Sequence, residues 1–315
     1  MVIIFKNNLM SVNLKTNFAG IDLNNPTILA SGILGVSKSS LNKVIESGAG
    51  AVTIKSISLE VRKGHETPII TTFEAGMLNA VGYSNPGAKE AAQEFSNLNE
   101  LGAPVIASII GQKDDDFKQV WEHLAGCGFV AIEVPLSCPH TPGFGTMGGQ
   151  HTPEMSENIT KLLREISGLP IIVKVSPNNP NMIDVAKAAE AAGAAAICAV
   201  NTAGPGMQID IESARPVLGF KIGGLSGPAL KPIAIRCVYD LYEAVKIPII
   251  GTGGITTAED AIEMLMAGAT ALGIGTAVYY GGPEVFKKIT EEMSEWLEKH
   301  DYKDIKEVIG LVHKH

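Results

Sequence analysis

A cysteine in a proline-containing loop is the residue of this sequence best suited to do chemistry. Cys138 stands in the run Ser137-Cys138-Pro139-His140. A free thiol has a pKa of about 8.5, so it becomes a useful base only where its surroundings favour the thiolate. The other cysteines lie in apolar stretches and are expected to be small buried hydrophobes: Cys127, Cys198 and Cys237. The cysteines form no CxxC pair, so we expect no zinc or iron–sulfur site and no bound metal.

Three glycine clusters suggest a second kind of site, one that binds phosphate. They are Gly223-Gly224-Leu225-Ser226-Gly227, Gly251-Thr252-Gly253-Gly254 and Gly273-Ile274-Gly275-Thr276, and each precedes a helical pattern. Glycines let backbone N–H groups approach an anion, and a helix N-terminus adds a favourable dipole. The plainer alternative is that these glycines only make tight turns. The pattern predicts a phosphorylated ligand and leaves open whether it is a substrate or a cofactor.

Short apolar runs that alternate with longer helical patterns must position these residues. We predict eight strands: Thr27–Ser31, Ala51–Lys55, Val105–Ile110, Val130–Pro135, Ile171–Val175, Ala195–Asn201, Ile247–Gly251 and Ala271–Gly275. We predict helices at Lys38–Glu46, Ala88–Leu101, Phe117–Cys127, Pro153–Ile166, Met182–Ala192, Pro228–Val245, Thr257–Ala267 and Pro283–His300. Strands that each precede a helix, and that are apolar throughout, indicate a parallel (β/α)8 barrel. No linker divides the chain, so we expect one domain over residues 1–315.

Three further segments add to this barrel. Leu14–Asn25 has the pattern of a small hairpin that would close the bottom of the barrel. Two insertions, Ile57–Pro86 and Ser137–Thr152, follow predicted strands two and four. The loops that follow the strands form the catalytic face of such barrels, so these insertions are where chemistry is expected.

Composition excludes several classes of protein. The 315-residue chain has a formal net charge of −8 spread over both halves, which gives no general attraction to nucleic acid. No apolar run reaches the roughly 18 to 20 residues of a membrane span. The first ten residues lack the basic region and cleavage site of a signal peptide, and the scattered cysteines favour a reducing compartment. We therefore expect a cytoplasmic protein with no nucleic-acid or membrane partner.

At the Cys138 loop the sequence resembles the dihydroorotate dehydrogenases, whose motif is Asn-x-Ser-Cys-Pro-Asn/His with the cysteine as base. Further matches cover nearly the whole chain: Ala30-Ser31-Gly32, Lys55-Ser56, Asn79 to Gly87, Lys174, Asn201-Thr202 and the glycine clusters. The resemblance implies a flavoprotein barrel that holds FMN and oxidises dihydroorotate to orotate in pyrimidine biosynthesis. The flavin would carry the redox chemistry while the barrel positions the substrate.

The cysteine form resembles the soluble branch of that family. The run from Gly223 to Pro232 is most similar to the branch that passes electrons to NAD through a separate subunit with FAD and a [2Fe–2S] cluster. The resemblance therefore implies a partner subunit, in a homodimer or heterotetramer.

The resemblance assigns roles to particular residues. Cys138 is the base. Residues implied at the flavin are Ala30, Ser31, Gly32, Lys55, Ser56, Ser108, Lys174, Val200, Gly227, Gly253, Gly254, Gly275 and Thr276. Residues implied at the substrate are Lys55, Asn79, Ala80, Val81, Gly82, Tyr83, His140, Asn201 and Thr202. In this reading Lys174 faces the flavin N1 edge and Lys55 lies near the flavin and the substrate carboxylate; the plainer reading makes each lysine a surface cation and each asparagine a turn residue.

Three positions depart from the family pattern. Pro135 stands where an Asn is usual, and proline has no side-chain donor and no backbone N–H. Ser108 stands where a flavin-contacting Asn is common, and His140 replaces a second Asn. His140 could replace one lost contact, relay a proton or simply pack. The substrate pocket therefore differs from that of typical members.

Three rival functions stay open. A dihydropyrimidine dehydrogenase-like flavoenzyme shares the Ser-Cys-Pro-His run but normally acts beside iron–sulfur domains. A dihydrouridine synthase would need a basic RNA-binding surface. A barrel lyase or isomerase without redox chemistry could use the phosphate site for its substrate, and a pure scaffold would leave the Cys138 loop unexplained.

Overall fold

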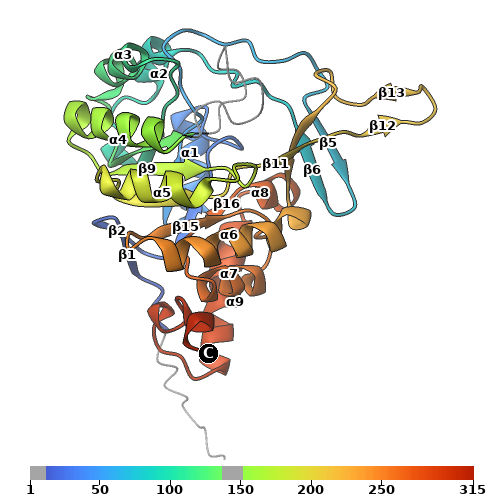
Figure 1. Ribbon diagram of the computed structural model, residues 1–315. Coiled ribbons are helices and arrows are strands. Elements are labelled where there is room, and N and C mark those ends of the chain that lie inside the picture. Colours follow the sequence, from blue (N-terminus) through green and yellow to red (C-terminus); the bar gives the residue numbers. More distant parts are fainter. Residues whose placement is uncertain (1–11, 137–151) are drawn as a thin grey trace, which may run out of the picture.

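Eight parallel strands close into a barrel in the computed structural model, which describes residues 12–136 and 152–315 (Figure 1). In barrel order they are β3 (Thr27–Leu29), β4 (Ala51–Thr53), β7 (Val105–Ser108), β8 (Ala131–Pro135), β9 (Ile171–Val175), β10 (Ala196–Ala199), β15 (Ile249–Thr252) and β16 (Ala271–Ile274). Each predicted strand overlaps one of these. The predicted (β/α)8 barrel is confirmed.

Helices surround the barrel (Figure 1). They are α1 (Lys38–Glu46), α2 (Ala88–Glu94), α3 (Asp114–Leu124), α4 (Pro153–Ser167), α5 (Met182–Ala191), α6 (Lys231–Ala244), α7 (Ala258–Met266), α8 (Thr276–Gly281) and α9 (Val285–Lys299). Short 3-10 turns are η1 (Leu98–Leu101), η2 (Pro228–Leu230), η3 (Ile305–Glu307) and η4 (Leu311–Lys314). None of the described helices is long and apolar enough to cross a lipid bilayer.

Some predicted helix bounds needed correction, and one helix was missed. The predicted helix Ala88–Leu101 ends at Glu94, because Asn97 has a left-handed φ of 56° and the chain continues as η1. Helix α3 begins at Asp114, ahead of the predicted Phe117, because the Asp116 carboxylate accepts hydrogen bonds from the amides that precede the helix. Helix α8 was not predicted as a separate element; Gly282, with φ 69°, separates it from α9.

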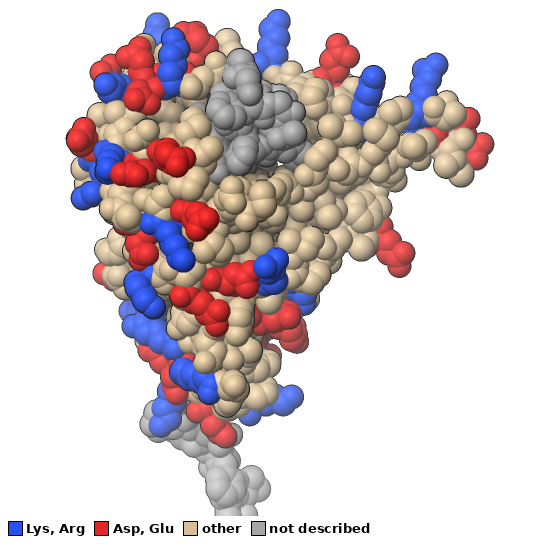
Figure 2. Space-filling model, viewed as in Figure 1, with Lys and Arg blue, Asp and Glu red and all other residues tan. Residues whose placement is uncertain are grey.

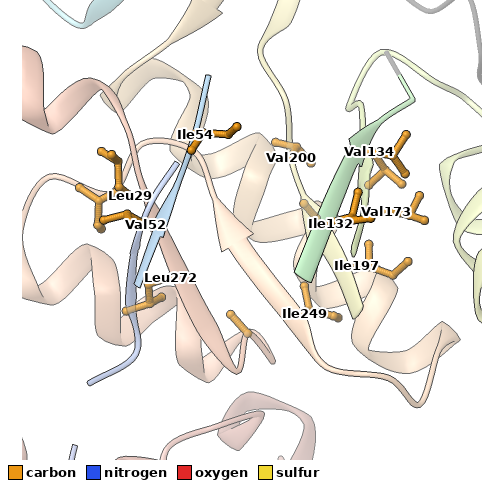
Figure 3. Close-up of a cluster of buried hydrophobic side chains, with 14 of the residues drawn as sticks. Leu29, Val52, Ile54, Ile132, Val134, Val173, Ile197, Val200, Ile249 and Leu272 are labelled. Atoms are coloured by element: carbon orange, nitrogen blue, oxygen red, sulfur yellow. The ribbon is translucent and has the colours of Figure 1, made fainter. Parts of the chain in front are cut away.

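The apolar core lies between the barrel and its helices. Outward-facing strand residues such as Leu29, Ile132 and Val173 belong to one buried cluster with helix residues such as Leu163 (Figure 3). Side chains alternate along a strand, so the neighbouring residues of the same strands point into the barrel. The strands are buried on both faces, which explains their continuous apolar sequence.

A hairpin closes the amino-terminal end of the barrel, as predicted. Strands β1 (Thr16–Phe18) and β2 (Ile21–Leu23) pair antiparallel. Phe18 is fully buried and shares an inner cluster with the early residues of the barrel strands, among them Ala51, Ala131 and Ala196. The hairpin therefore fills the space that the small alanine side chains leave.

A four-stranded antiparallel sheet lies beyond the carboxyl ends of the strands. Its order is β11 (Ala203–Gly206), β14 (Gly223–Ser226), β6 (Gly76–Asn79) and β5 (Ile70–Phe73). The predicted insertion Ile57–Pro86 supplies two of these strands, whereas the insertion around 203–226 was not predicted. It also contains the projecting pair β12 (Ile209–Asp210) and β13 (Arg215–Pro216) (Figure 1). Residues 137–151 of the predicted insertion Ser137–Thr152 lie outside the described residues.

Replacement of Phe18 tests the role of the hairpin. Phe18→Ala removes a fully buried ring from the barrel end, so we expect the free energy of unfolding to fall by about 3–5 kcal/mol. Urea unfolding followed by circular dichroism measures this change. Lys15→Ala, which alters an exposed side chain of the same segment, is the control and should change the unfolding free energy by less than about 0.5 kcal/mol.

Candidate active site

A pocket opens at the carboxyl end of the barrel strands, under the four-stranded sheet. Every barrel strand except β7 places at least one lining residue in the pocket, either on the strand or in the loop that follows it. The sequence-predicted residues that line it are Ala30, Ser31, Gly32, Lys55, Ser56, Asn79, Ala80, Val81, Gly82, Tyr83, Lys174, Val200, Asn201, Thr202, Gly227, Gly253, Gly254, Gly275 and Thr276. The structure thus brings together residues that lie far apart in the sequence.

One end of the pocket is lined by the glycine clusters. The amides of Gly253, Gly254 and Gly275 donate no hydrogen bond to any other described residue, although all three residues line the pocket. Gly253 and Gly254 have φ values of 127° and 78°, which L side chains rarely adopt. Backbone donors without an internal acceptor fit a phosphate group. This end of the pocket therefore suits the phosphate of a nucleotide such as FMN.

Asp260 fixes the loop that carries the Gly253 and Gly254 amides. Its carboxylate accepts hydrogen bonds from the Lys231 ammonium at 2.7 Å, from the Thr256 amide at 2.9 Å and from the Thr257 amide at 3.0 Å. A Cβ on Gly254 would lie 2.6 Å from the backbone nitrogen of Lys231, so the loop packs directly on the start of α6. The network couples η2, α6 and α7 to the phosphate end.

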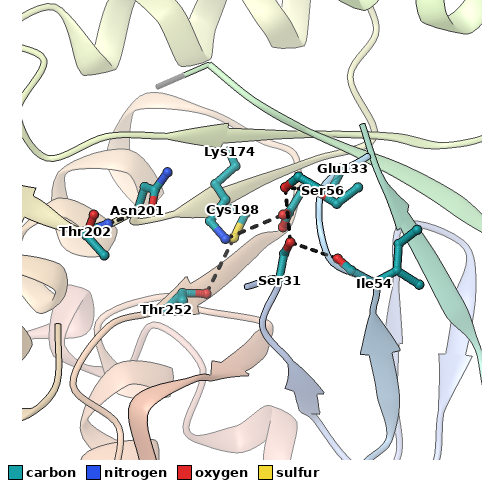
Figure 4. Close-up of polar contacts among 10 residues, drawn as sticks. Ser31, Ile54, Ser56, Glu133, Lys174, Cys198, Asn201, Thr202 and Thr252 are labelled. Atoms are coloured by element: carbon teal, nitrogen blue, oxygen red, sulfur yellow. Dashed lines mark hydrogen bonds and ion pairs between the residues drawn. The ribbon is translucent and has the colours of Figure 1, made fainter. Parts of the chain in front are cut away.

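A layer of polar side chains lies on the inner face of the barrel at the base of the pocket. Its members are Ser108, Glu133, Lys174, Cys198 and Thr252, from five neighbouring strands. Glu133, Lys174 and Thr252 line the pocket, whereas Ser108 and Cys198 do not. Each of the five stands two residues after an apolar residue of the inner cluster, so strand alternation directs it inward. Figure 4 shows the side chains of Glu133, Lys174, Cys198 and Thr252 gathered at this level.

Of the two lysines that line the pocket, Lys174 has a carboxylate partner among the described residues and Lys55 has none. The Lys174 ammonium lies 3.5 Å from a Glu133 carboxylate oxygen, and both side chains are buried. Burial by itself would lower the pKa of Lys174, but the Glu133 carboxylate and the Cys198 side chain together outweigh it, so the net pKa lies above the ordinary value. Burial, with the nearby charge of Lys174, lowers the pKa of Lys55. Burial also raises the pKa of the Cys198 thiol to about 12, so this cysteine stays protonated.

Ser108 does not line the pocket. Its hydroxyl is fully buried and shares a hydrogen bond of 2.8 Å with Ser56, which does line the pocket. Ser56 in turn lies 3.3 Å from the Ser31 hydroxyl, and Ser31 donates to the Ile54 carbonyl (Figure 4). Any effect of Ser108 on a ligand therefore passes through Ser56.

Another part of the pocket wall carries amides and aromatic rings. The Asn79 side chain donates to the Gly224 carbonyl at 3.2 Å, and the Asn201 side-chain oxygen accepts from the Thr202 amide at 2.8 Å. Both asparagines therefore have fixed orientations. Planar amides at fixed angles suit a heterocycle that presents alternating donors and acceptors.

His65 and Phe220 were not predicted, although both line the pocket. Their rings stack at a centroid distance of 3.8 Å and join the two insertions at the mouth. A Cβ on Gly82 would lie 2.8 Å from the His65 ring, so the glycine permits this packing. Glu133 was also missed. Strand alternation could have indicated that Glu133 points inward, but no sequence signal indicated the stacking of His65 on Phe220.

Two predicted residues, Cys138 and His140, lie outside the described residues. Cys127, Cys198 and Cys237 are buried free thiols, as predicted. Among the described residues no group of His, Cys, Asp and Glu could hold a metal ion. On the face in Figure 2, acidic and basic side chains of the described residues are interspersed.

The sequence profile described as "Dihydroorotate dehydrogenase" matches residues 13–297, most of the chain that forms this pocket. The chain belongs to the dihydroorotate dehydrogenase family. The resemblance inferred from the motifs is therefore confirmed.

Relatives within the family match the chain over nearly its whole length. The protein of Methanothermobacter thermautotrophicus is 42% identical over 95% of this chain and 98% of its own. The protein of Pyrococcus abyssi is 44% identical over 96% of this chain and 99% of its own. Both are named dihydroorotate dehydrogenase B (NAD(+)), catalytic subunit.

The Asp260 network predicts an acid-dependent loss of stability. Burial alone would raise the pKa of Asp260, but hydrogen bonds from Lys231, Thr256 and Thr257 lower it below its ordinary value of 3.8. The ionised Asp260 carboxylate therefore contributes its full stabilisation of the fold above about pH 4, and this contribution is lost as the pH falls through the pKa of Asp260 in the folded protein. Asp260→Asn should lower the free energy of unfolding at pH 7 by about 2 kcal/mol, and the difference from the unmodified protein should shrink below pH 4.

Denaturant unfolding at several pH values measures this effect. The control is Glu259→Gln, which changes an exposed carboxylate in the same helical turn. A difference between the Asp260→Asn and unmodified proteins that is the same at pH 3 and pH 7 would contradict the assignment.

Proposed function

We propose that this protein oxidises dihydroorotate to orotate, with bound FMN as the electron acceptor, in pyrimidine biosynthesis. The observation that carries the proposal is the near full-length family match of a chain whose described family motifs contribute to one pocket. Members of this family are FMN-dependent oxidoreductases. The chain acts as a single domain over residues 1–315.

The two ends of the pocket suit two parts of this reaction. The amides of Gly253, Gly254 and Gly275 would hold the FMN phosphate, together with Gly227 and Thr276. Ala30, Ser31, Gly32, Ser56 and Val200 would line the ring system, with Ser108 acting through Ser56. FMN, when bound, supplies the hydride acceptor. Lys174 would face the ring edge where negative charge develops on reduction.

The substrate end accounts for the shape and charge of dihydroorotate. Lys55 would bind the substrate carboxylate, since it is a half-buried cation of the pocket wall without a salt bridge to any described carboxylate. Asn79, Asn201 and Thr202 would hydrogen-bond the ring amides, and Ala80 to Tyr83 would complete the wall. Dihydrouracil lacks a carboxylate, so Lys55 favours dihydroorotate over the substrate of a dihydropyrimidine dehydrogenase.

Cys138 acts as the base in this proposal. Its thiolate would take the proton from ring carbon 5 as the hydride leaves carbon 6, which creates the carbon–carbon double bond of orotate. His140 follows in the same loop and would contact the substrate or relay the proton. The assignment of both residues rests on the family motif, since they lie outside the described residues.

The electrons would leave through a second protein. The relatives are named catalytic subunits of an NAD(+)-linked enzyme, which supports a separate partner. We propose a subunit with FAD and a [2Fe–2S] cluster that passes electrons to NAD, in a complex built on a homodimer or heterotetramer. We propose that the complex works in the cytoplasm.

An anaerobic absorbance spectrum tests the function. The purified protein should carry a flavin band that dihydroorotate bleaches and that dihydrouracil leaves unchanged. Bleaching by dihydrouracil alone would favour the dihydropyrimidine reading. A protein that takes up no FMN would favour a lyase or isomerase that uses the phosphate site for its substrate.

Replacement of Cys138 tests the base. Cys138→Ser should leave FMN bound but slow bleaching by dihydroorotate by about 10²-fold or more near pH 7, because a serine hydroxyl is a far weaker acid than a thiol. Stopped-flow absorbance measures the rate. Cys237→Ser, at a buried thiol of α6, is the matched control. An unchanged rate in Cys138→Ser would remove this residue from the role of base.

A further inference from the structure

Glu133 is a buried carboxylate for which the proposed reaction has no role. Its side chain is 4% exposed, yet the residue lines the pocket. It is the one carboxylate among the described lining residues of the pocket, and these residues also include two lysines, Lys55 and Lys174. A buried charge is costly unless it is paired, so the presence of Glu133 needs an explanation.

The geometry ties Glu133 to one of these lysines directly. Its carboxylate lies 3.5 Å from the Lys174 ammonium, and the two residues stand on adjacent strands β8 and β9 (Figure 4). The second lysine, Lys55, follows β4 on another part of the barrel wall and feels the positive charge of Lys174. The described lining of the pocket therefore holds two cations and one anion.

We propose that Glu133 is the counter-ion that allows Lys55 and Lys174 to be cationic at the same time in one pocket. The inference rests on the proposed function in one respect, since Lys55 serves the substrate carboxylate and Lys174 the flavin. Without Glu133, the pocket would hold two like charges, and the pair of lysines would release its first proton at a lower pH. Glu133 is thus a positioning residue, which acts through the lysines.

Other titratable groups around the lysines do not supply this negative charge. His65 and Tyr83 line the same pocket, and Cys198 lies beneath it as a thiol whose pKa is about 12. A histidine adds positive charge or none, and a tyrosine or thiol is neutral near pH 7. Of the described groups that face the lysines, only the Glu133 carboxylate offsets their charge.

Trace labelling with acetic anhydride tests the inference without turnover, flavin or substrate. Only the neutral amine reacts, so the pH dependence of labelling at Lys55 and Lys174, read by mass spectrometry, reports when each lysine loses its proton. In Glu133→Gln we expect the first of these two profiles to move to lower pH by at least about one unit. Glu133→Asp keeps the carboxylate, so its labelling profiles should lie close to those of the unmodified protein.

Two further variants make the result specific. Glu263→Gln removes a carboxylate from another lysine, Lys231, outside the pocket, and should leave the Lys55 profile unchanged. Lys174→Met removes the neighbouring cation and should move the Lys55 profile to higher pH, which tests the same coupling if Glu133→Gln does not fold. Profiles of Lys55 and Lys174 that are the same with and without Glu133 would overturn the inference.

Orotate binding links the result to function. In the FMN-loaded protein, the Kd of orotate from flavin absorbance should rise at least about tenfold at pH 9 in Glu133→Gln and approach the unmodified value at pH 6. A factor that is constant across this range would indicate a merely structural role and contradict the inference. If dihydroorotate bleaches the unmodified protein but Glu133→Gln leaves the labelling profiles unchanged, the proposed function stands and the inference fails. If Glu133→Gln shifts the profiles but dihydroorotate does not bleach the unmodified protein, the inference stands and the proposed function fails.

Discussion

Closure of the barrel forces every second side chain of its strands into a confined interior, and the pocket depends on how that interior is filled. At the amino-terminal end, Phe18 from the hairpin and small residues such as Ala51 and Ala131 form a dry inner cluster. Two residues further along the strands, the inward positions become polar, with Glu133 and Lys174 at the centre. The apolar layer excludes water from below, so the charges above it interact through a medium of low polarity.

The pocket combines two kinds of recognition. Backbone amides at Gly253, Gly254 and Gly275 suit a phosphate, and the loop that carries Gly253 and Gly254 is held by Asp260, which lies outside the pocket. Side-chain charges and amides at the other end suit an anionic heterocycle. The roof comes from two insertions, which pair as β6 and β14 and are also joined by the stacked rings of His65 and Phe220.

The departures from the family pattern have a structural setting. Pro135 is the last residue of β8 and lines the pocket, and the next amide, that of Leu136, donates to the Lys174 carbonyl. Pro135 therefore ends the strand, and the hydrogen bond from the Leu136 amide to β9 is kept. Ser108 is joined to Ser56 rather than to the cavity. The two serine hydroxyls satisfy each other, so Ser108 presents no polar group to the cavity.

The amino-acid sequence by itself determined the barrel and the hairpin, because these depend on local patterns, and its family motifs indicated many of the described pocket residues. Continuous apolar runs mark strands that are buried on both faces, and glycines such as Gly254 mark backbone conformations that other residues rarely adopt. The tertiary structure alone decided the pairing of β6 with β14, the stack of His65 on Phe220 and the ion pair of Lys174 with Glu133. Each of these contacts joins residues far apart in the chain. Periodicity indicates which face a side chain occupies, but only the closed barrel determines which side chain lies opposite it.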